Sequence, residues 1–267
     1  MMKLLSPDAR AEKRLAICLA LIAAYVDAYG LRAFATYVSF MSGNTTQTGS
    51  LTGQGNFVAA LRPILAILFF VAGSFAGTWL THSGLRHARQ LLFGVVAAML
   101  AVTIGVMQPS SLYADFGIAT LSLAMGMMNT TLSRIGAEQV SLTFVTGTLN
   151  RIGSHLALAL RGEPPSDALG PWDTQLRRAG LLASIWGGFL TGAMVSAAAA
   201  SYIGVWILLP PVLFLLVLAL VWVPLTPDTV STEQPARSML APMMNPTTEA
   251  AEASMVAGRR KLWEGER

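Results

Sequence analysis

The chain has 267 residues, of which 54% are hydrophobic and only 12% are charged. Soluble domains carry about 25% charged residues, so this composition excludes an ordinary soluble domain and indicates an integral membrane protein. The net charge of +4 comes without a stripe of basic and aromatic residues, which argues against a nucleic-acid partner.

Residues that catalysis or metal binding would need are sparse. The single cysteine, Cys18, excludes an internal disulfide or a cysteine-based metal cluster. The three histidines, His82, His87 and His155, lack the HExxH spacing, and no GxSxG or P-loop string occurs. We therefore expect no enzyme activity, no metal and no cofactor.

Six apolar segments approach the length of about 20 residues that a membrane-spanning helix needs. They are residues 15–31, 63–80, 91–107, 116–132, 181–200 and 202–223. The first follows the basic residues of segment 1–14, a pattern that a signal peptide shares, but five further spans favour a retained helix.

The distribution of Lys and Arg supports six spans. With both termini in the cytoplasm, six spans leave only Arg32 and Arg62 of the 18 basic residues outside, as the positive-inside rule predicts. Eight spans would place Arg151 within the membrane. We predict a multi-pass protein of the bacterial inner membrane with a cytoplasmic segment 1–14, and a disordered cytoplasmic tail at 224–267.

Two polar, glycine-containing motifs recur at an offset of 104 residues. Residues 38–49 read VSFMSGNTTQTG and residues 142–153 read LTFVTGTLNRIG. The helices that follow them also correspond, because Gly73 aligns with Gly192 and Gly77 with Ser196. Since each half has three spans, an odd number, the halves are predicted to be inverted repeats, at about 15–107 and 114–223. The predicted fold is all-α and polytopic, with about six transmembrane helices and two Gly-broken motif segments.

Inverted repeats with glycine-interrupted segments at matching positions are typical of transporters with a site near the membrane midplane. Backbone groups freed by a broken helix must be buried in protein or line a polar cavity. The candidate substrate-binding residues are Asp27, Phe40, Ser42, Gly43, Asn44, Thr45, Asn129, Phe144, Thr146, Gly147 and Thr148. The alternative is that both motifs are ordinary extramembrane loops, with residues 42–44 forming a tight turn and a helix cap.

Asp27 lies deep in the first predicted span, and an ionisable group at that depth is a functional hypothesis by default. Desolvation would favour its protonated form, which suits proton coupling. The alternative is a helix that starts late, so that Asp27 caps it or pairs with Arg32 near the outer surface. Asn129 is the neutral counterpart in the fourth span.

The strings YVDAYGLRAFATYVSFMSGNTTQTG, MGMMNTTLSRIG and LTFVTGTLN resemble the YoaK-like family of bacterial integral membrane proteins of unknown function. The resemblance covers residues 15–223 and implies membrane location and the repeated motif, but no substrate. Its motif positions here are Asp27, Phe40, Gly43, Asn44, Asn129, Phe144, Thr146, Gly147 and Thr148. Ser42 departs from the family pattern FMTGN but keeps the hydroxyl group.

We predict a transporter or channel-like protein for a small solute, in contact with the lipid bilayer. The alternatives are a non-transporting membrane scaffold or sensor and, more weakly supported, an enzyme acting on lipid-borne substrates. Gly73 and Gly77 permit close packing of the second helix on the fifth, with assembly into a homo-oligomer as the alternative use.

Overall fold

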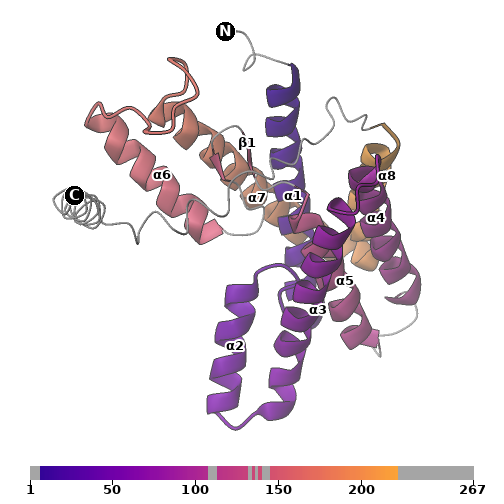
Figure 1. Cartoon of the computed structure of the whole chain (residues 1–267). Helices are drawn as coiled ribbons and strands as arrows, with labels where there is room; N and C mark the ends of the chain where they lie inside the picture. Colours follow the sequence, from indigo (N-terminus) through magenta and orange to yellow (C-terminus); the bar gives the residue numbers. More distant parts are fainter. Residues whose placement is uncertain (1–6, 108–112, 132–133, 136–137, 140–144, 222–267) are drawn as a thin grey trace, which may run out of the picture. The chain divides into compact units, whose positions relative to one another are not determined.

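The part of the chain that the structure describes is predominantly helical (Figure 1). The computed structural model describes residues 7–107, 113–131, 134–135, 138–139 and 145–221. The helices are α1 (Pro7–Phe34), α2 (Met41–Gly53), α3 (Phe57–Thr81), α4 (Ala88–Met107), α5 (Ala114–Asn129), α6 (Val145–Leu160), α7 (Gln175–Ile203), the 3-10 helix η2 (Gly204–Leu208) and α8 (Leu209–Val221). One antiparallel pair of two-residue strands joins β1 (Arg134–Ile135) to β2 (Glu138–Gln139), so the all-α prediction holds apart from this pair.

Each of the six predicted spans overlaps a helix of the structure. Among the described residues, four helical segments have the length and hydropathy to cross a membrane, namely Ala11–Phe34, Phe57–Thr81, Ala88–Met107 and Gln175–Val221. The last contains two predicted spans, α7 and α8, and α5 is a shorter helix of 16 residues. The number of spans stays a prediction, and the predicted tail lies outside the described residues.

Several helices begin earlier than the apolar runs that predict them. The segment 1–14 was expected to precede the first helix, but α1 begins at Pro7, since proline is favourable in the first helical turn. The Asn56 side chain accepts a hydrogen bond from the Ala59 amide, which starts α3 six residues before the predicted position 63. Thr174 caps α7 in the same way through the Arg177 amide.

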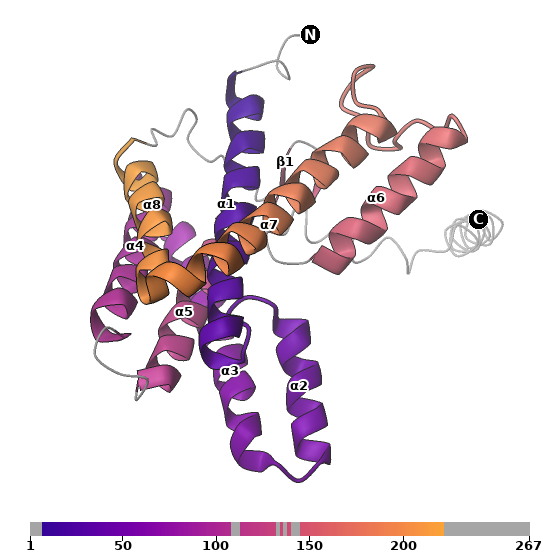
Figure 2. The ribbon, with the colours of Figure 1, turned by 180° about the vertical axis from the view of Figure 1, so that it is seen from behind.

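The motif segments are helical from Met41 and from Val145 onward, so the prediction that glycine breaks them is wrong. α2 contains Gly43 and Gly49, and α6 contains Gly147 and Gly153. A glycine costs a helix only about 1 kcal/mol relative to alanine. Packing offsets this cost, because α2 lies along α3 and α6 lies along α7 (Figures 1 and 2).

The long helices pack in pairs that relate the two halves of the chain. α1 packs against α7, α3 against α5, and α4 against both α8 and α5, so the prediction that the second span packs on the fifth is wrong. The sequence repeat matches α1 with α5 and α3 with α7. Under this matching, the packed pair α1–α7 is equivalent to the packed pair α5–α3. The largest contacts within residues 7–221 therefore follow the order of the sequence repeat.

The pattern of buried and exposed residues repeats between the halves, with a constant offset within each pair of matched helices. Residues 41–50 of α2 and 145–154 of α6 have the same degree of burial at every aligned position, and so do residues 15–26 and 117–128. The five buried residues of α3 correspond to buried residues of α7 at an offset of 119. They are Ala60, Pro63, Ala66, Gly73 and Gly77, matched by Ala179, Leu182, Ile185, Gly192 and Ser196.

Glycines bring the backbones of the paired helices into contact. A Cβ atom added to Gly192 would overlap the carbonyl oxygen of Leu21 on α1, and one added to Gly73 would overlap that of Leu123 on α5. Leu21 and Leu123 are separated by 102 residues, as are Asp27 and Asn129. A side chain at either glycine would displace the backbone of the neighbouring helix. The two helix pairs therefore depend on equivalent contacts between a glycine and a backbone carbonyl.

Candidate functional site

The connection between α1 and α2, residues 35–40, is the most irregular part of the first motif. α1 ends at Phe34, and Ala35 adopts a positive φ of 54°, which non-glycine residues rarely adopt. The Ala35 amide still donates to the carbonyl oxygen of Leu31 at 3.0 Å, so the chain turns sharply away from the helix axis. The remaining backbone groups of this segment need partners from elsewhere.

Asp27 supplies two of these partners. Its Oδ1 atom accepts hydrogen bonds from the amides of Val38 at 2.8 Å and Ser39 at 2.7 Å, and the residue is 5% exposed. Seven residues separate it from the end of α1, which is about 10 Å along the helix. The predicted alternatives, a late helix start or a pair with Arg32, do not occur, because α1 begins far upstream and none of the ion pairs among described residues involves Asp27.

Asn44 and Gln47 fix the same segment from the α2 side. The Asn44 side chain is fully buried; it accepts from the Tyr37 amide at 3.1 Å and donates to the Tyr37 carbonyl at 2.7 Å. The Gln47 amide donates to the Ala35 carbonyl at 3.1 Å. The polar groups of the first motif therefore hold residues 35–40 between α1 and α2.

The other predicted residues of the first motif serve packing or face outward. Gly43 lies beneath the ring of Phe40, where a Cβ atom would overlap the ring, and Tyr37 packs edge-on against Phe40. Ser42 and Thr45 are exposed, and the Thr45 hydroxyl donates to the Met41 carbonyl at 2.8 Å. Such bonds to the helix backbone satisfy a hydroxyl donor where no water is present.

The described part of the second motif repeats the burial of the first, but only some of its residue types. Thr148, at the position of Asn44, is buried, whereas Thr146 is exposed and Gly147 and Asn129 are partly buried. Phe144 lies outside the described residues. Within the described part of the chain, α2 and α6 are not a packed pair, so the residues of the two motifs are not brought together into one predicted site.

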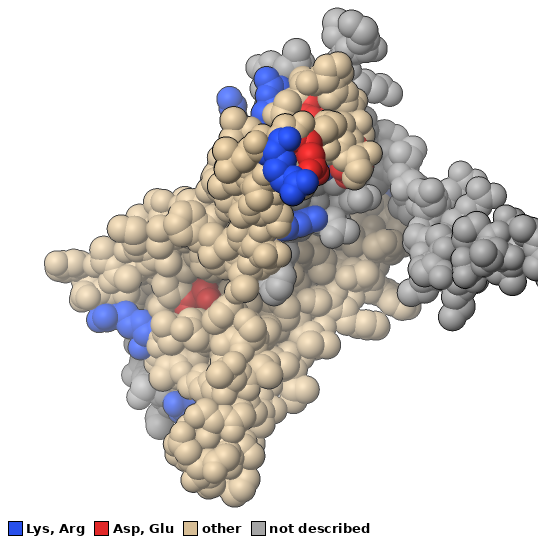
Figure 3. Space-filling model, turned by 90° about the vertical axis from the view of Figure 1, so that its left-hand side faces the viewer, with Lys and Arg blue, Asp and Glu red and all other residues tan. Residues whose placement is uncertain are grey.

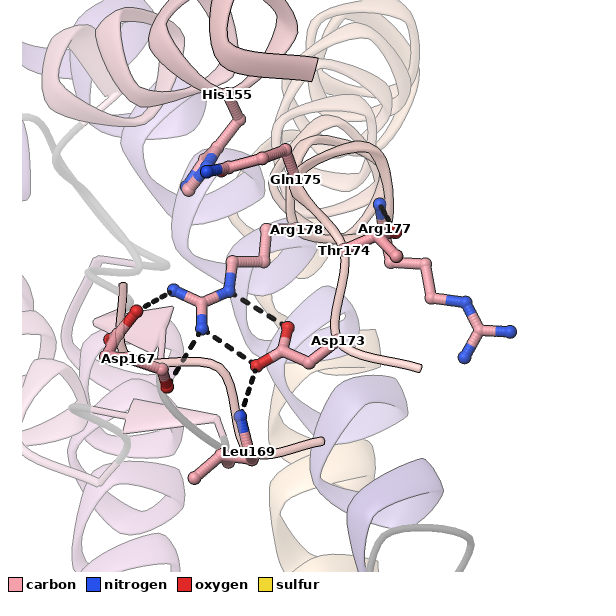
Figure 4. Close-up of polar contacts among 8 residues, drawn as sticks. All are labelled: His155, Asp167, Leu169, Asp173, Thr174, Gln175, Arg177 and Arg178. Carbon is pink, nitrogen blue, oxygen red and sulfur yellow. Dashed lines mark hydrogen bonds and ion pairs between the residues drawn. The ribbon is translucent and has the colours of Figure 1, made fainter. Parts of the chain in front are cut away.

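A polar cluster at the junction of α6 and α7 was missed by the sequence prediction. Arg178, 7% exposed, donates from Nε and Nη2 to both carboxylate oxygens of Asp173 at 3.0 and 2.8 Å, and from Nη1 to Asp167 at 2.7 Å (Figure 4). His155 of α6 contacts Gln175 at 2.5 Å. The available signal was the run of acidic and basic residues between two apolar helices.

The bidentate pair changes the acid chemistry of this cluster. The Arg178 guanidinium holds the pKa of Asp173 below its usual range. Partial burial opposes this shift, and a hydrogen bond from the Leu169 amide adds to it.

Charged side chains are unevenly distributed over the face of the molecule that Figure 3 shows. Acidic and basic side chains gather at the top of this face, and wide uncharged areas separate them from the few others. Among the described residues, no group of three His, Cys, Asp or Glu side chains could hold a metal ion.

These features define a polytopic helical membrane protein with two polar helical hairpins. Residues 15–221 match the family described as "Protein of unknown function (DUF1275)", and the chain belongs to this family. It is 32% identical over 194 residues to the UPF0700 transmembrane protein RA0705 of Rhizobium meliloti (strain 1021), covering 70% of this chain and 77% of the relative. No solved structure matches the chain.

Proposed function

We propose that the chain is an inner-membrane transporter for a small, uncharged polar solute, built from two inverted repeats of three spans. The observation that carries the proposal is the match between the halves, in which Gly73 meets Leu123 as Gly192 meets Leu21. The resemblance to the YoaK-like family and the positive-inside distribution support the bacterial inner membrane, with both termini in the cytoplasm.

The position of α2 supports a polar path through the membrane. Only residues 54–56 separate α2 from α3, so α2 runs back alongside the first half of α3. α3 has 25 residues and is about 37 Å long, whereas the hydrocarbon core is about 30 Å thick. Thus a spanning α3 places much of α2 at hydrocarbon depth.

The exposed surface of α2 is poorly suited to lipid. Its exposed positions carry hydroxyl groups or no side chain, namely Ser42, Thr45, Thr46, Gly49, Ser50, Thr52 and Gly53. Polar surface at this depth is more stable against protein or a water-filled cavity than against lipid, although the Thr45 and Thr46 hydroxyls already donate to the helix backbone. We propose that this surface, and the exposed polar positions of α6, line the solute path and become accessible in turn as the halves move. On α6 these positions are Thr146, Asn150 and Ser154.

The experiment begins with accessibility. In a Cys18→Ala background, Thr46→Cys and Asn150→Cys report on equivalent exposed positions of α2 and α6, and Ser83→Cys in the α3–α4 loop marks the cytoplasmic side. We expect a membrane-impermeant thiol reagent to label Thr46→Cys from outside and Asn150→Cys from the cytoplasm. Labelling of both from one side would contradict inverted repeats.

Transport itself is measured in proteoliposomes that contain the whole chain. We expect light scattering to report faster swelling with at least one member of a panel of small uncharged solutes, such as glycerol, urea and monosaccharides. Gly192→Leu, which blocks the packing of α7 on α1, should abolish this flux. A protein that labels as expected but moves none of the panel would favour the second function below.

A membrane scaffold without transport is the second candidate, and one observation favours it. The side chains of Asp27, Asn44 and Gln47 form hydrogen bonds with residues 35–40. Fewer of their polar atoms are therefore available to bind a solute. In that case these residues would be needed for folding only.

A further inference from the structure

We infer that Asp27 is the proton-binding site of the proposed transporter, and that its protonation state controls the position of α2. This inference rests on the proposed function and assigns its coupling ion. The reaction is the reversible transfer of one proton from a hydronium ion to the Asp27 carboxylate: one O–H bond of hydronium breaks as the carboxyl O–H bond forms, and a water molecule is released.

The geometry gives the carboxylate a specific role. Both backbone donors, the amides of Val38 and Ser39, converge on Oδ1. Hydrogen bonds to an ionised acceptor are roughly twice as strong as neutral ones. Protonation on Oδ2 would keep Oδ1 as an acceptor but weaken both bonds, so residues 35–40 would be held less firmly.

The segment transmits this change directly to α2. Tyr37, next to Val38, is clamped at its amide and its carbonyl by the Asn44 side chain, and the Ala35 carbonyl accepts from Gln47. Asn44 and Gln47 are both residues of α2. A shift of the connection after protonation of Asp27 therefore moves the hydroxyl-bearing surface that we place along the solute path.

The repeat makes the proton site asymmetric. The position equivalent to Asp27 is occupied by Asn129, an amide that does not titrate. Only the first half can then respond to pH through this position, while the second half offers a built-in control at α6.

The neighbours of α1 contain few groups that could titrate in place of Asp27. α7 runs parallel to α1, since Gly188 meets Ile17 and Gly192 meets Leu21; its Arg177 and Arg178 lie in its first turn and Tyr202 is 87% exposed. α5 contributes Asp115, in its first turn, which pairs with Arg62 at 3.2 Å. The remaining titratable groups are Arg134 of β1, Tyr37 in the connection and, on α1 itself, Cys18, Tyr25, Tyr29 and Arg32 together with Asp8, Arg10, Glu12, Lys13 and Arg14 near its N-terminal end.

The test follows α2 by electron paramagnetic resonance of a nitroxide attached to Thr46→Cys, in full-length Cys18→Ala protein in liposomes between pH 4 and 10. We expect one change in nitroxide mobility that fits the binding of a single proton. Asp27→Asn should abolish the change and hold the low-pH spectrum throughout. A nitroxide at Asn150→Cys serves as the control: its pH response should be the same with Asp27 and with Asp27→Asn.

The inference is overturned if the Thr46→Cys transition survives Asp27→Asn, or if no transition occurs with Asp27 present. Asp27→Glu keeps the carboxyl group and should move the midpoint, so an unmoved midpoint also overturns it, even if Asp27→Asn fails to fold. Arg134→Gln should retain the transition. If the protein moves solute and the two cysteines are labelled from opposite sides, but no Asp27-dependent transition occurs, the proton site is refuted and the transporter proposal stands. If the Asp27-dependent transition occurs without solute flux or opposite-side labelling, the transporter proposal is refuted and the proton site stands.

Discussion

The two hairpins, α2–α3 and α6–α7, have the same pattern of burial but are held together by different chemistry. In the first, a loop of three residues joins the helices, and Asp27 of α1 and Asn44 hold the segment before the hairpin. In the second, residues 161–174 join the helices, and Arg178 with Asp173 holds the loop within the hairpin. The repeat therefore preserves helix packing, whereas the polar contacts have diverged.

This difference separates structural from regulatory roles. Contacts that are repeated, such as those of Gly73 and Gly192, serve the common scaffold. Contacts found in one half only can give that half a response of its own. The predictions below test the two kinds of contact, beginning with the largest expected effect.

The largest effect should follow loss of the Arg178 side chain. Arg178→Met leaves Asp173, whose side chain is 9% exposed, without its cation. Breaking a buried pair by removing one partner costs about 3–5 kcal/mol. We expect this loss in the free energy of unfolding in detergent micelles, measured by circular dichroism. The control is Arg177→Met, since Arg177 is exposed, and a similar cost for both variants would contradict the role of the pair.

The repeated glycines should respond alike in the two halves. Gly73→Ala and Gly192→Ala each force a methyl group against a backbone carbonyl, and overpacking of this kind costs about 1–3 kcal/mol. Thermal unfolding in detergent should show equal losses. Gly49→Ala and Gly153→Ala point into open space and should be neutral or slightly stabilising. A cost at Gly192 without one at Gly73 would break the equivalence of the halves.

Buried and exposed positions of the two motifs should differ in their effect on stability. Asn44→Ala leaves the amide and carbonyl of Tyr37 without their partner, which costs about 1–3 kcal/mol for a buried polar group. Thr146→Ala removes an exposed side chain and should change the free energy of unfolding by less than about 0.5 kcal/mol. If Thr146→Ala nevertheless abolishes solute flux while Asn44→Ala lowers stability, the second motif contributes to the solute path and the first to its support.

The long helices were predictable because apolar runs of this length have few other uses. The burial of Asp27 within a long helix was predictable for the same reason. The helices α2 and α6 were not, since their sequences are rich in Gly, Ser and Thr and gain stability from packing on α3 and α7. Nor were the partners of Asp27 and Arg178, because a hydrogen bond across 11 residues or an ion pair across a loop depends on a turn such as that at Ala35.

Acid should loosen the second hairpin but not through Asp27. Because Arg178 holds the pKa of Asp173 below its usual range, the folded hairpin binds fewer protons than the unfolded one near pH 4. The stabilisation is present above about pH 4, the usual range for an aspartate, and is lost as the pH falls through the lowered value. A nitroxide at Ser166→Cys, an exposed position beside Asp167, should become more mobile in that range. Asp173→Asn should remove this acid response, and a response that persists would assign it to another group.

The smallest effect concerns the exit from α1. Ala35 has a φ of 54°, which costs a non-glycine residue about 1–2 kcal/mol, whereas Thr130, the residue after α5, has a φ of −84° and no such cost. Ala35→Gly removes the strain but gives the unfolded chain more freedom, worth about 0.5–1 kcal/mol, so we expect a net stabilisation of at most about 1 kcal/mol in thermal unfolding. Thr130→Gly, the matched change, should destabilise by a similar amount. If Ala35→Gly stabilises the protein and also reduces the change in mobility of the nitroxide at Thr46→Cys with pH, the backbone strain at Ala35 contributes to the motion of α2. If that change in mobility is unaltered, the strain affects only the stability of the turn.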